Sequence, residues 1–173
     1  MTQVQARTYT ASLDARGLGF GPPLPAKPSS GGLHIRTASI RHGEQVLYAP
    51  AESNLEWFVL GNTAQARLNA PMGLVEHYEA GAAGMELTWV LQQPLRSAEE
   101  LVVECEFTGW SYSTTTAAGH HWADAEGVIR ARVNDARVVD ASGRTWELPL
   151  RVAGNRLLAT VSPTILSEAQ YPQ

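Results

Sequence analysis

The stretch Met85-Glu86-Leu87-Thr88-Trp89-Val90-Leu91 places an apolar side chain at every second position, with Glu86 and Thr88 between them. Successive side chains of a β-strand point to opposite faces, so this pattern predicts a strand with one buried and one solvated face. Residues 81–84, which read Gly-Ala-Ala-Gly, supply a turn signal directly before it. Half-buried strands of this kind are typical of antiparallel sheets.

The same two-residue period recurs along the chain, and turn signals separate the runs. Alternating runs cover residues 9–13, 33–35, 55–59, 101–107, 129–133, 146–152 and 157–161, with turn signals at 134–135, 142–143 and 154–155. Pro149 lacks a backbone donor, which predicts an edge position or a bulge for its strand. No stretch has a strong helical period, and residues 98–100 and 162–169 are two candidates for a short helical turn. The sequence therefore predicts an all-β fold, an antiparallel β-sandwich.

Domain organisation is less tightly constrained than fold class. The 173 residues suit one large all-β domain or two small ones. A stretch rich in Pro, Gly and Ser at 19–32 predicts a long loop or connector. A second turn signal, Ala70-Pro71-Met72-Gly73, marks a possible boundary. We expect two packed β sub-domains, residues 1–69 and 70–173, with a single sandwich as the alternative.

Composition excludes several classes of function. The net charge of −4 and the pI near 5.7 provide no basic surface for nucleic acid or anionic lipid. The sequence contains no signal peptide and no apolar run long enough to insert into a membrane. The single cysteine, Cys105, cannot form an internal disulfide, and its place in an alternating run predicts a buried, inert thiol.

Three blocks of sequence resemble a known family. They are residues 70–78 (APMGLVEHY) followed by 84–89 (GMELTW), then 138–149 (VVDASGRTWELP), then 161–172 (VSPTILSEAQYP). In this order they are similar to segments of a β-rich module found near the N-terminus of large secreted and cell-surface bacterial proteins. The resemblance covers roughly residues 50–172, and its motifs are short.

This resemblance implies an extracellular or cell-surface location and a position before β-propeller, adhesin-like or other repeat domains. It implies no catalytic residue. The chain ends at Gln173, where relatives continue, and it lacks their signal peptide. We therefore expect either a fragment or a stand-alone relative, whose partners are neighbouring domains or other protein subunits.

Catalytic and metal-binding motifs receive little support from the sequence. The adjacent His120 and His121 would point to opposite faces of a strand, so histidines on a polar surface loop are favoured over a metal site. Gly17 to Gly21 superficially resembles a phosphate loop, but the prolines at 22 and 23 forbid the required helix. We expect no enzyme activity, no cofactor and no metal.

Acidic residues are assigned to solvent or to turns. Glycoside hydrolysis needs two carboxylates that meet in space, and the candidates are Glu76, Glu86, Glu104 and Glu106. Because they alternate with apolar residues, a solvated sheet face is the favoured interpretation. Four acidic residues occur in turn sequences and are expected to cap them: Asp124, Glu126, Asp135 and Asp140. The alternative is that such loop oxygens bind calcium, although the order of a calcium loop is missing.

Three aromatic residues provide the sequence's one candidate binding site. Trp110, Tyr112 and Trp122 flank a Thr-rich stretch, residues 114–116. If exposed, they could stack on a sugar ring or contact a protein, but the favoured interpretation is that they pack beneath a long loop. The expected function is a non-catalytic structural or interaction module, and the alternative is a carbohydrate-binding module that uses these three residues.

Overall fold

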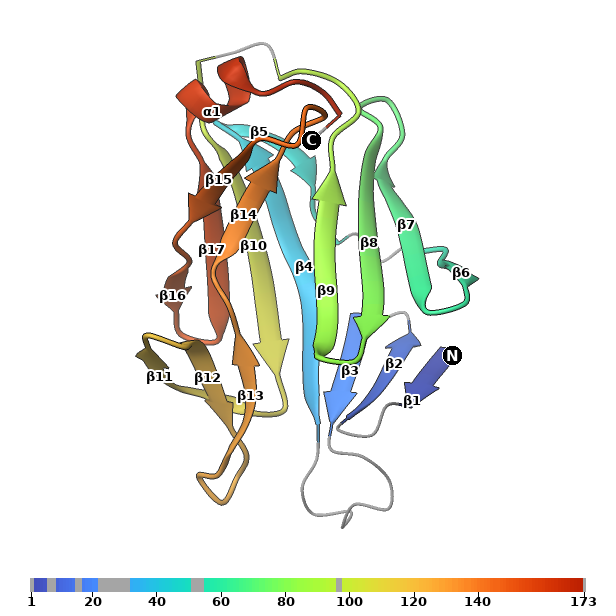
Figure 1. The fold of residues 1–173 in the computed structure, drawn as a ribbon, viewed down its shortest axis with the longest axis vertical. Helices are drawn as coiled ribbons and strands as arrows, with labels where there is room; N and C mark the ends of the chain where they lie inside the picture. The colour runs from blue at the N-terminus through green and yellow to red at the C-terminus, as the bar shows by residue number, and fades with distance from the viewer. Residues whose placement is uncertain are drawn as a thin grey trace.

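A computed structural model describes residues 2–5, 9–14, 17–21, 32–50, 55–95 and 98–172. Most of the described chain is strand, and the fold is all-β and sandwich-like (Figure 1). The predicted fold class is therefore confirmed. In this part of the chain no helix is long and apolar enough to cross a membrane.

The largest sheet has eight antiparallel strands. In spatial order they are β1 (Thr2–Gln5), β2 (Thr10–Asp14), β3 (Gly17–Gly21), β4 (Leu33–His42), β10 (Leu101–Thr108), β17 (Arg156–Val161) and β16 (Arg151–Ala153). The eighth strand, β5 (Gln45–Tyr48), pairs with the C-terminal end of β4. β3 pairs with the N-terminal end of β4, so β3 and β5 share one edge of that long strand.

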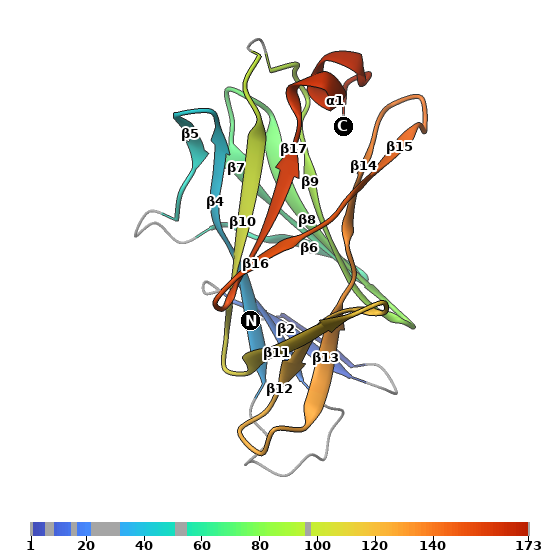
Figure 2. The same cartoon turned by 90° about the vertical axis from the view of Figure 1, so that its left-hand side faces the viewer.

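A second antiparallel sheet faces the first. It contains β6 (Phe58–Leu60), β7 (Thr63–Asn69), β8 (Leu74–Gly81) and β9 (Gly84–Val90), in that order. A three-stranded sheet follows, made of β11 (Ser111–Thr116), β12 (Gly119–Ala123) and β13 (Ile129–Val133), and then a hairpin of β14 (Ala136–Val139) and β15 (Thr145–Leu148). Figure 2 shows this smaller sheet and the hairpin in the same view as the two main sheets.

Buried side chains join the sheets in three adjoining clusters. The first joins β4, β10 and β17 to β8, the β14–β15 hairpin and the helix. The second packs Phe107 and Cys105 of β10 against Trp122 of β12. The third packs β2 and β3 against β7 and β8 through residues such as Leu18 and Tyr78. One face of the large sheet is thus covered along its length by the smaller elements.

Two strand assignments differ from the sequence expectations. Residues 19–21 of the expected loop belong to β3. Leu18 and Phe20 of this strand pack inward, and its glycines pair with β2 and β4. The rest of the expected loop up to residue 31 lies outside the described residues. The run 146–152 is not one strand. Pro149, which cannot donate to a ladder, separates β15 from β16, and these strands pair in different sheets.

The chain on either side of residue 70 contributes to both main sheets. β4 pairs with β10, and β7 pairs with β8. The expected boundary falls in the turn of the β7–β8 hairpin, where Gly73 has a φ of 62° and its amide donates to the carbonyl of Ala70. The two stretches therefore share sheets instead of forming separate ones.

The short helix α1 (Pro163–Glu168) lies at one of the two predicted positions, whereas residues 98–100 form no helix. Ser162 caps it by accepting a 3.3 Å hydrogen bond from the amide of Ile165 at its side-chain oxygen. Proline at the first helical position has the required φ and no amide to satisfy. Leu166 is the helix's buried residue and packs on the first core cluster.

Candidate docking groove

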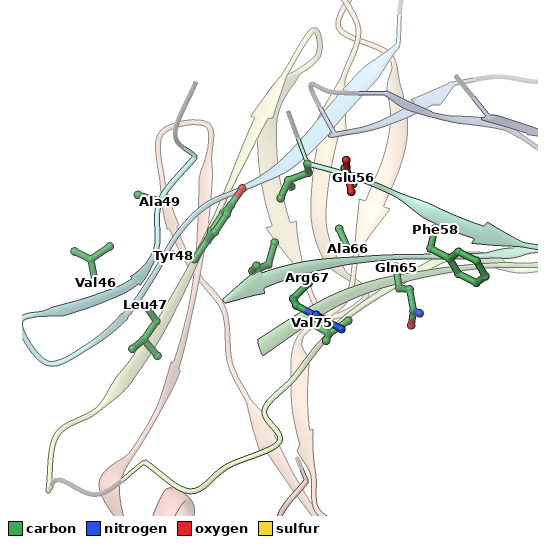
Figure 3. Close-up of a pocket in the computed structure, with 12 residues that line it drawn as sticks. Val46, Leu47, Tyr48, Ala49, Glu56, Phe58, Gln65, Ala66, Arg67 and Val75 are labelled. Atoms are coloured by element: carbon green, nitrogen blue, oxygen red, sulfur yellow. The ribbon is translucent and has the colours of Figure 1, made fainter. Parts of the chain in front are cut away.

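A surface depression lies where the edges of the two main sheets approach each other. It has a volume of about 720 Å³ and is lined by residues of β5, of the segment 55–58 and of β7, with Val75 of β8. Figure 3 shows β5 with Val46, Leu47 and Tyr48 on one side, and the strands bearing Phe58 and Arg67 on the other. We call this depression the β5–β7 groove.

A side-chain hydrogen bond connects the two walls of the groove. Nδ2 of Asn69, the last residue of β7, donates a 2.8 Å bond to the carbonyl oxygen of Leu47 in β5. Oδ1 of the same side chain accepts a 3.2 Å bond from the amide of Met72. Asn69 therefore holds the hairpin turn of β7–β8 and fixes the spacing of β5 and β7 at this point.

Apolar side chains at the groove are unusually exposed. Val46 is 56% exposed and Phe58 is 62% exposed, although both lie in strands. Leu47, which lies next to Val46 in β5, is in contrast buried in the first core cluster. Large apolar side chains clustered at a strand edge are typical of protein contacts.

Two opposite charges, Glu56 and Arg67, also line the groove. Both are exposed, and neither forms an ion pair with another described residue. Tyr48 adds a hydroxyl whose pKa is raised, first by burial and then by the negative charge of Glu76. The groove therefore combines apolar surface with a few polar groups, as binding sites in general do.

The aromatic residues predicted to bind a ligand lie mainly in the core. Trp110 is 3% exposed and Trp122 is 0% exposed, so neither offers an indole face to a sugar. Trp122 stacks on Phe107 with ring centroids 4.4 Å apart, and Tyr112 meets its edge at 5.7 Å. The interpretation that they pack beneath other residues describes them correctly, and only Tyr112 is partly accessible.

The expectation that His120 and His121 lie on a surface loop is wrong. Both belong to β12, since the Thr-rich stretch before them forms the paired strand β11. His120 is 4% exposed; its Nδ1 lies 2.9 Å from Oγ1 of Thr115 and its Nε2 lies 3.4 Å from Oδ1 of Asp135. No group of three or more potential metal ligands occurs among the described residues.

Glu76 is also misplaced by the sequence interpretation, which assigns it to a solvated face. It is 2% exposed and points from β8 toward β4. Its Oε1 accepts a 2.7 Å bond from the Thr37 hydroxyl and a 3.0 Å bond from the Tyr78 hydroxyl. Its period-two position matches that of buried Leu74 and Tyr78 in the same strand, which is a signal that the sequence contained.

The other acidic candidates occupy the expected environments. Glu104 and Glu106 lie on the outer face of β10, where they pair with Arg156 and Arg36. Glu86 is exposed on β9. Glu104 and Glu106 share the outer face of β10, where Arg156 pairs with both, whereas Glu76 points into the core from β8.

Asp124 and Asp140 cap their turns as predicted, whereas the Asp135 carboxylate accepts a 3.0 Å bond from the amide of Leu150, which lies outside its turn. Asp140 caps its turn by accepting bonds from the amides of Ser142 and Arg144, and Asp124 does the same for Glu126 and Val128. Cys105 is buried in the core. Burial raises the pKa of its thiol well above the usual range, which leaves it protonated and unreactive.

No pattern in the sequence predicts the β5–β7 groove. Its walls come from strands that do not pair with each other, and a sequence pattern gives no register between such strands. One local signal was present. Residues 57–60 (Trp-Phe-Val-Leu) are continuously apolar, so a strand there must expose apolar side chains on one face unless both faces are covered.

Comparisons with protein-family models, with curated proteins and with solved structures found no match. The resemblance to N-terminal modules of bacterial surface proteins therefore stays a prediction.

Proposed function

We propose that this chain is a non-catalytic structural and interaction module of a bacterial surface or secreted protein, or of an extracellular assembly, and that it docks on another polypeptide through the β5–β7 groove. The observation that carries the proposal is the exposure of Val46 and Phe58 beside strand edges that the described residues leave unpaired. Soluble proteins usually cover or charge such edges.

The internal polar groups support a structural role. Glu76 is hydrogen-bonded to Thr37 and Tyr78, and His120 contacts Thr115 and Asp135. Bonds of this kind connect strands to one another and use the side chains' hydrogen-bonding capacity within the fold. The partner that we propose is a neighbouring domain of a larger protein or another protein subunit.

Site-specific photo-crosslinking tests this function. A benzoyl-phenylalanine at position 58, introduced into the protein in its host, would label the polypeptide that occupies the groove. The labelled segment is identified by mass spectrometry, made in pure form and titrated against the chain by calorimetry. Val46→Ser should weaken binding at least about tenfold, because burying a valine side chain contributes roughly 1.5–3 kcal/mol.

Val139→Ser is the matched control. Val139 is a strand valine on β14 that is 44% exposed and does not line the groove. The Val139→Ser protein should bind the labelled segment with the same affinity as wild type. Equal affinities for the Val46→Ser and wild-type proteins, or no specific cross-link from position 58, would contradict the proposal.

A further inference from the structure

The docking proposal leaves open which kind of polypeptide enters the groove, and the edge of β5 bears on that question. β5 pairs with β4 on one side, and no described strand pairs with its other edge. The Leu47 carbonyl faces this other edge, because the Asn69 side chain on β7 donates to it. The open backbone edge of β5 thus faces the groove.

The opposite wall also has an uncovered edge. β6 pairs with β7 only over Thr63 to Gln65, whereas β7 continues to Asn69. Ala66, Arg67 and Leu68, the residues beyond β6, line the groove. Backbone amides and carbonyls at an open edge are satisfied most completely by another strand.

We propose that the occupant of the β5–β7 groove is an extended polypeptide segment that pairs with the outer edge of β5 and lays alternate apolar side chains against Val46 and Phe58. This inference rests on the proposed function and names the form of the partner. β5 has four residues and strands rise by about 3.3 Å per residue, so its edge is about 13 Å long. A segment paired along this whole edge displaces the Asn69 side chain from the Leu47 carbonyl.

The geometry favours a single segment over a second copy of this chain. A strand within a folded sheet has its next strand about 4.8 Å away. Suppose that an edge strand of a second copy paired with β5. The neighbouring strand of that second copy would then lie where β7 lies, because Asn69 of β7 reaches Leu47 of β5 directly. A lone segment brings no such neighbour.

Glu56 and Arg67 bear on the charge of the segment that would bind in the groove. They lie in the same groove, carry opposite charges and form no ion pair with described residues. A segment with few charges, or with one of each sign, matches such a lining. A strongly acidic or basic segment would meet one like charge.

Peptide titration tests the inference. The probe is an acetylated and amidated hexapeptide of alternating valine and threonine, and its control is the same peptide with every backbone amide N-methylated. NMR of the labelled chain follows binding at Leu47 and Phe58. The unmodified peptide should bind with perturbations centred on β5, and N-methylation should weaken it at least tenfold, since it removes the donors that pair with an edge.

Variants of the chain locate the binding. Val46→Ser and Phe58→Ser should each weaken the unmodified peptide several-fold, and Val139→Ser should not. Both groove side chains are more than half exposed, so these variants should fold, which circular dichroism verifies. Failure of the peptide to bind at about 1 mM, or equal binding of its N-methylated form, would overturn the inference.

Other results separate the inference from the proposed function. Concentration-dependent dimerisation that Val46→Ser abolishes would mean that a second copy fills the groove, which overturns the strand inference but keeps the docking function. A cross-linked partner whose binding requires Val46, but which binds as a folded domain, would also overturn the strand inference and keep the docking function. If no interaction of the chain is weakened by Val46→Ser, both the docking function and the strand inference are wrong.

Discussion

The hydroxyl of Thr37 donates a 2.7 Å hydrogen bond to Oε1 of Glu76, and so connects β4 of the large sheet to β8 of the facing sheet. The same hydroxyl accepts a 2.9 Å bond from Nε1 of Trp89 on β9. Tyr78 donates a further bond to Glu76. A polar group at the centre of the sandwich thereby specifies how the two sheets face each other.

The buried carboxyl of Glu76 should make stability depend on pH. Burial raises the pKa of Glu76 above its usual value of 4.5, and outweighs the hydrogen bonds from Thr37 and Tyr78 that lower it. The folded state therefore favours the protonated acid. The stability that this group contributes is complete below the unfolded pKa and is lost as pH rises through the higher folded pKa.

Glu76→Gln isolates this effect, because the amide oxygen still accepts both bonds and carries no charge. The free energy of unfolding of the variant, relative to wild type, should increase as the pH rises above about 4.5, as measured by urea denaturation across pH 4–8. Glu79→Gln, an exposed position on the same strand, should show no such rise. A constant difference between Glu76→Gln and wild type would contradict the prediction.

Local patterns account for the parts of the fold that the sequence predicted. Alternation in 101–107 and the turns at 142–143 and 154–155 reflect interactions between near neighbours, and the structure has strands and turns there. The expectations for Glu76 and His120 are wrong because a polar side chain in a strand can be buried where other strands supply hydrogen-bond partners. Their burial depends on Thr37 and Thr115, which supply hydrogen bonds from other strands.

The groove shows a second limit of sequence reasoning. Its position depends on how far β6 extends along β7 and on the pairing of β5 with only one end of β4. Those lengths follow from long-range packing and have no local signature. The apolar run at 57–60 indicated that something must cover an outward face, but it did not indicate what.

Trp122 should contribute to stability and not to sugar binding. Its side chain is completely buried and stacks on Phe107. Trp122→Ala should lower the free energy of unfolding by about 3–5 kcal/mol, because it removes a large buried ring and leaves a cavity. Tyr112→Ala, which removes a partly exposed ring, should cost less. Urea denaturation of both variants checks this order, and a Trp122→Ala protein as stable as wild type would disprove it.

The Asp140 turn should fail at strongly acidic pH. Its carboxylate accepts bonds from the Ser142 hydroxyl and from the amides of Gln170, Arg144 and Ser142, which lower its pKa to about 2. Stability from this group is complete above the unfolded pKa, near 3.8, and is lost as pH falls through about 2.

Asp140→Asn should therefore lower the thermal midpoint at pH 7 and reduce the further loss of stability between pH 4 and pH 2. Thermal unfolding followed by circular dichroism at these pH values measures both effects. Ser142→Ala removes the hydroxyl bond alone, so it should lower the midpoint at pH 7 by less. A midpoint for Asp140→Asn that tracks wild type at every pH would show that the carboxylate charge is unimportant.

Asn69 offers a way to change the groove without changing its apolar lining. Its Nδ2 donates to the carbonyl of Leu47, and its Oδ1 accepts from the amide of Met72. Asn69→Ala removes both bonds and should cost about 1–3 kcal/mol of stability, since each net hydrogen bond contributes roughly 0.5–1.5 kcal/mol. Asn69→Asp keeps the acceptor for Met72 and loses the donor to Leu47.

Hydrogen exchange separates the two roles of Asn69. The Met72 amide should exchange faster in Asn69→Ala than in Asn69→Asp, because only the second variant retains an acceptor for it. Both variants free the Leu47 carbonyl, so the valine–threonine peptide should bind both of them more tightly than wild type if a strand pairs with this edge of β5. Unchanged or weaker peptide binding in both variants would mean that the Asn69 bond forms part of the docking surface and does not compete with the incoming strand.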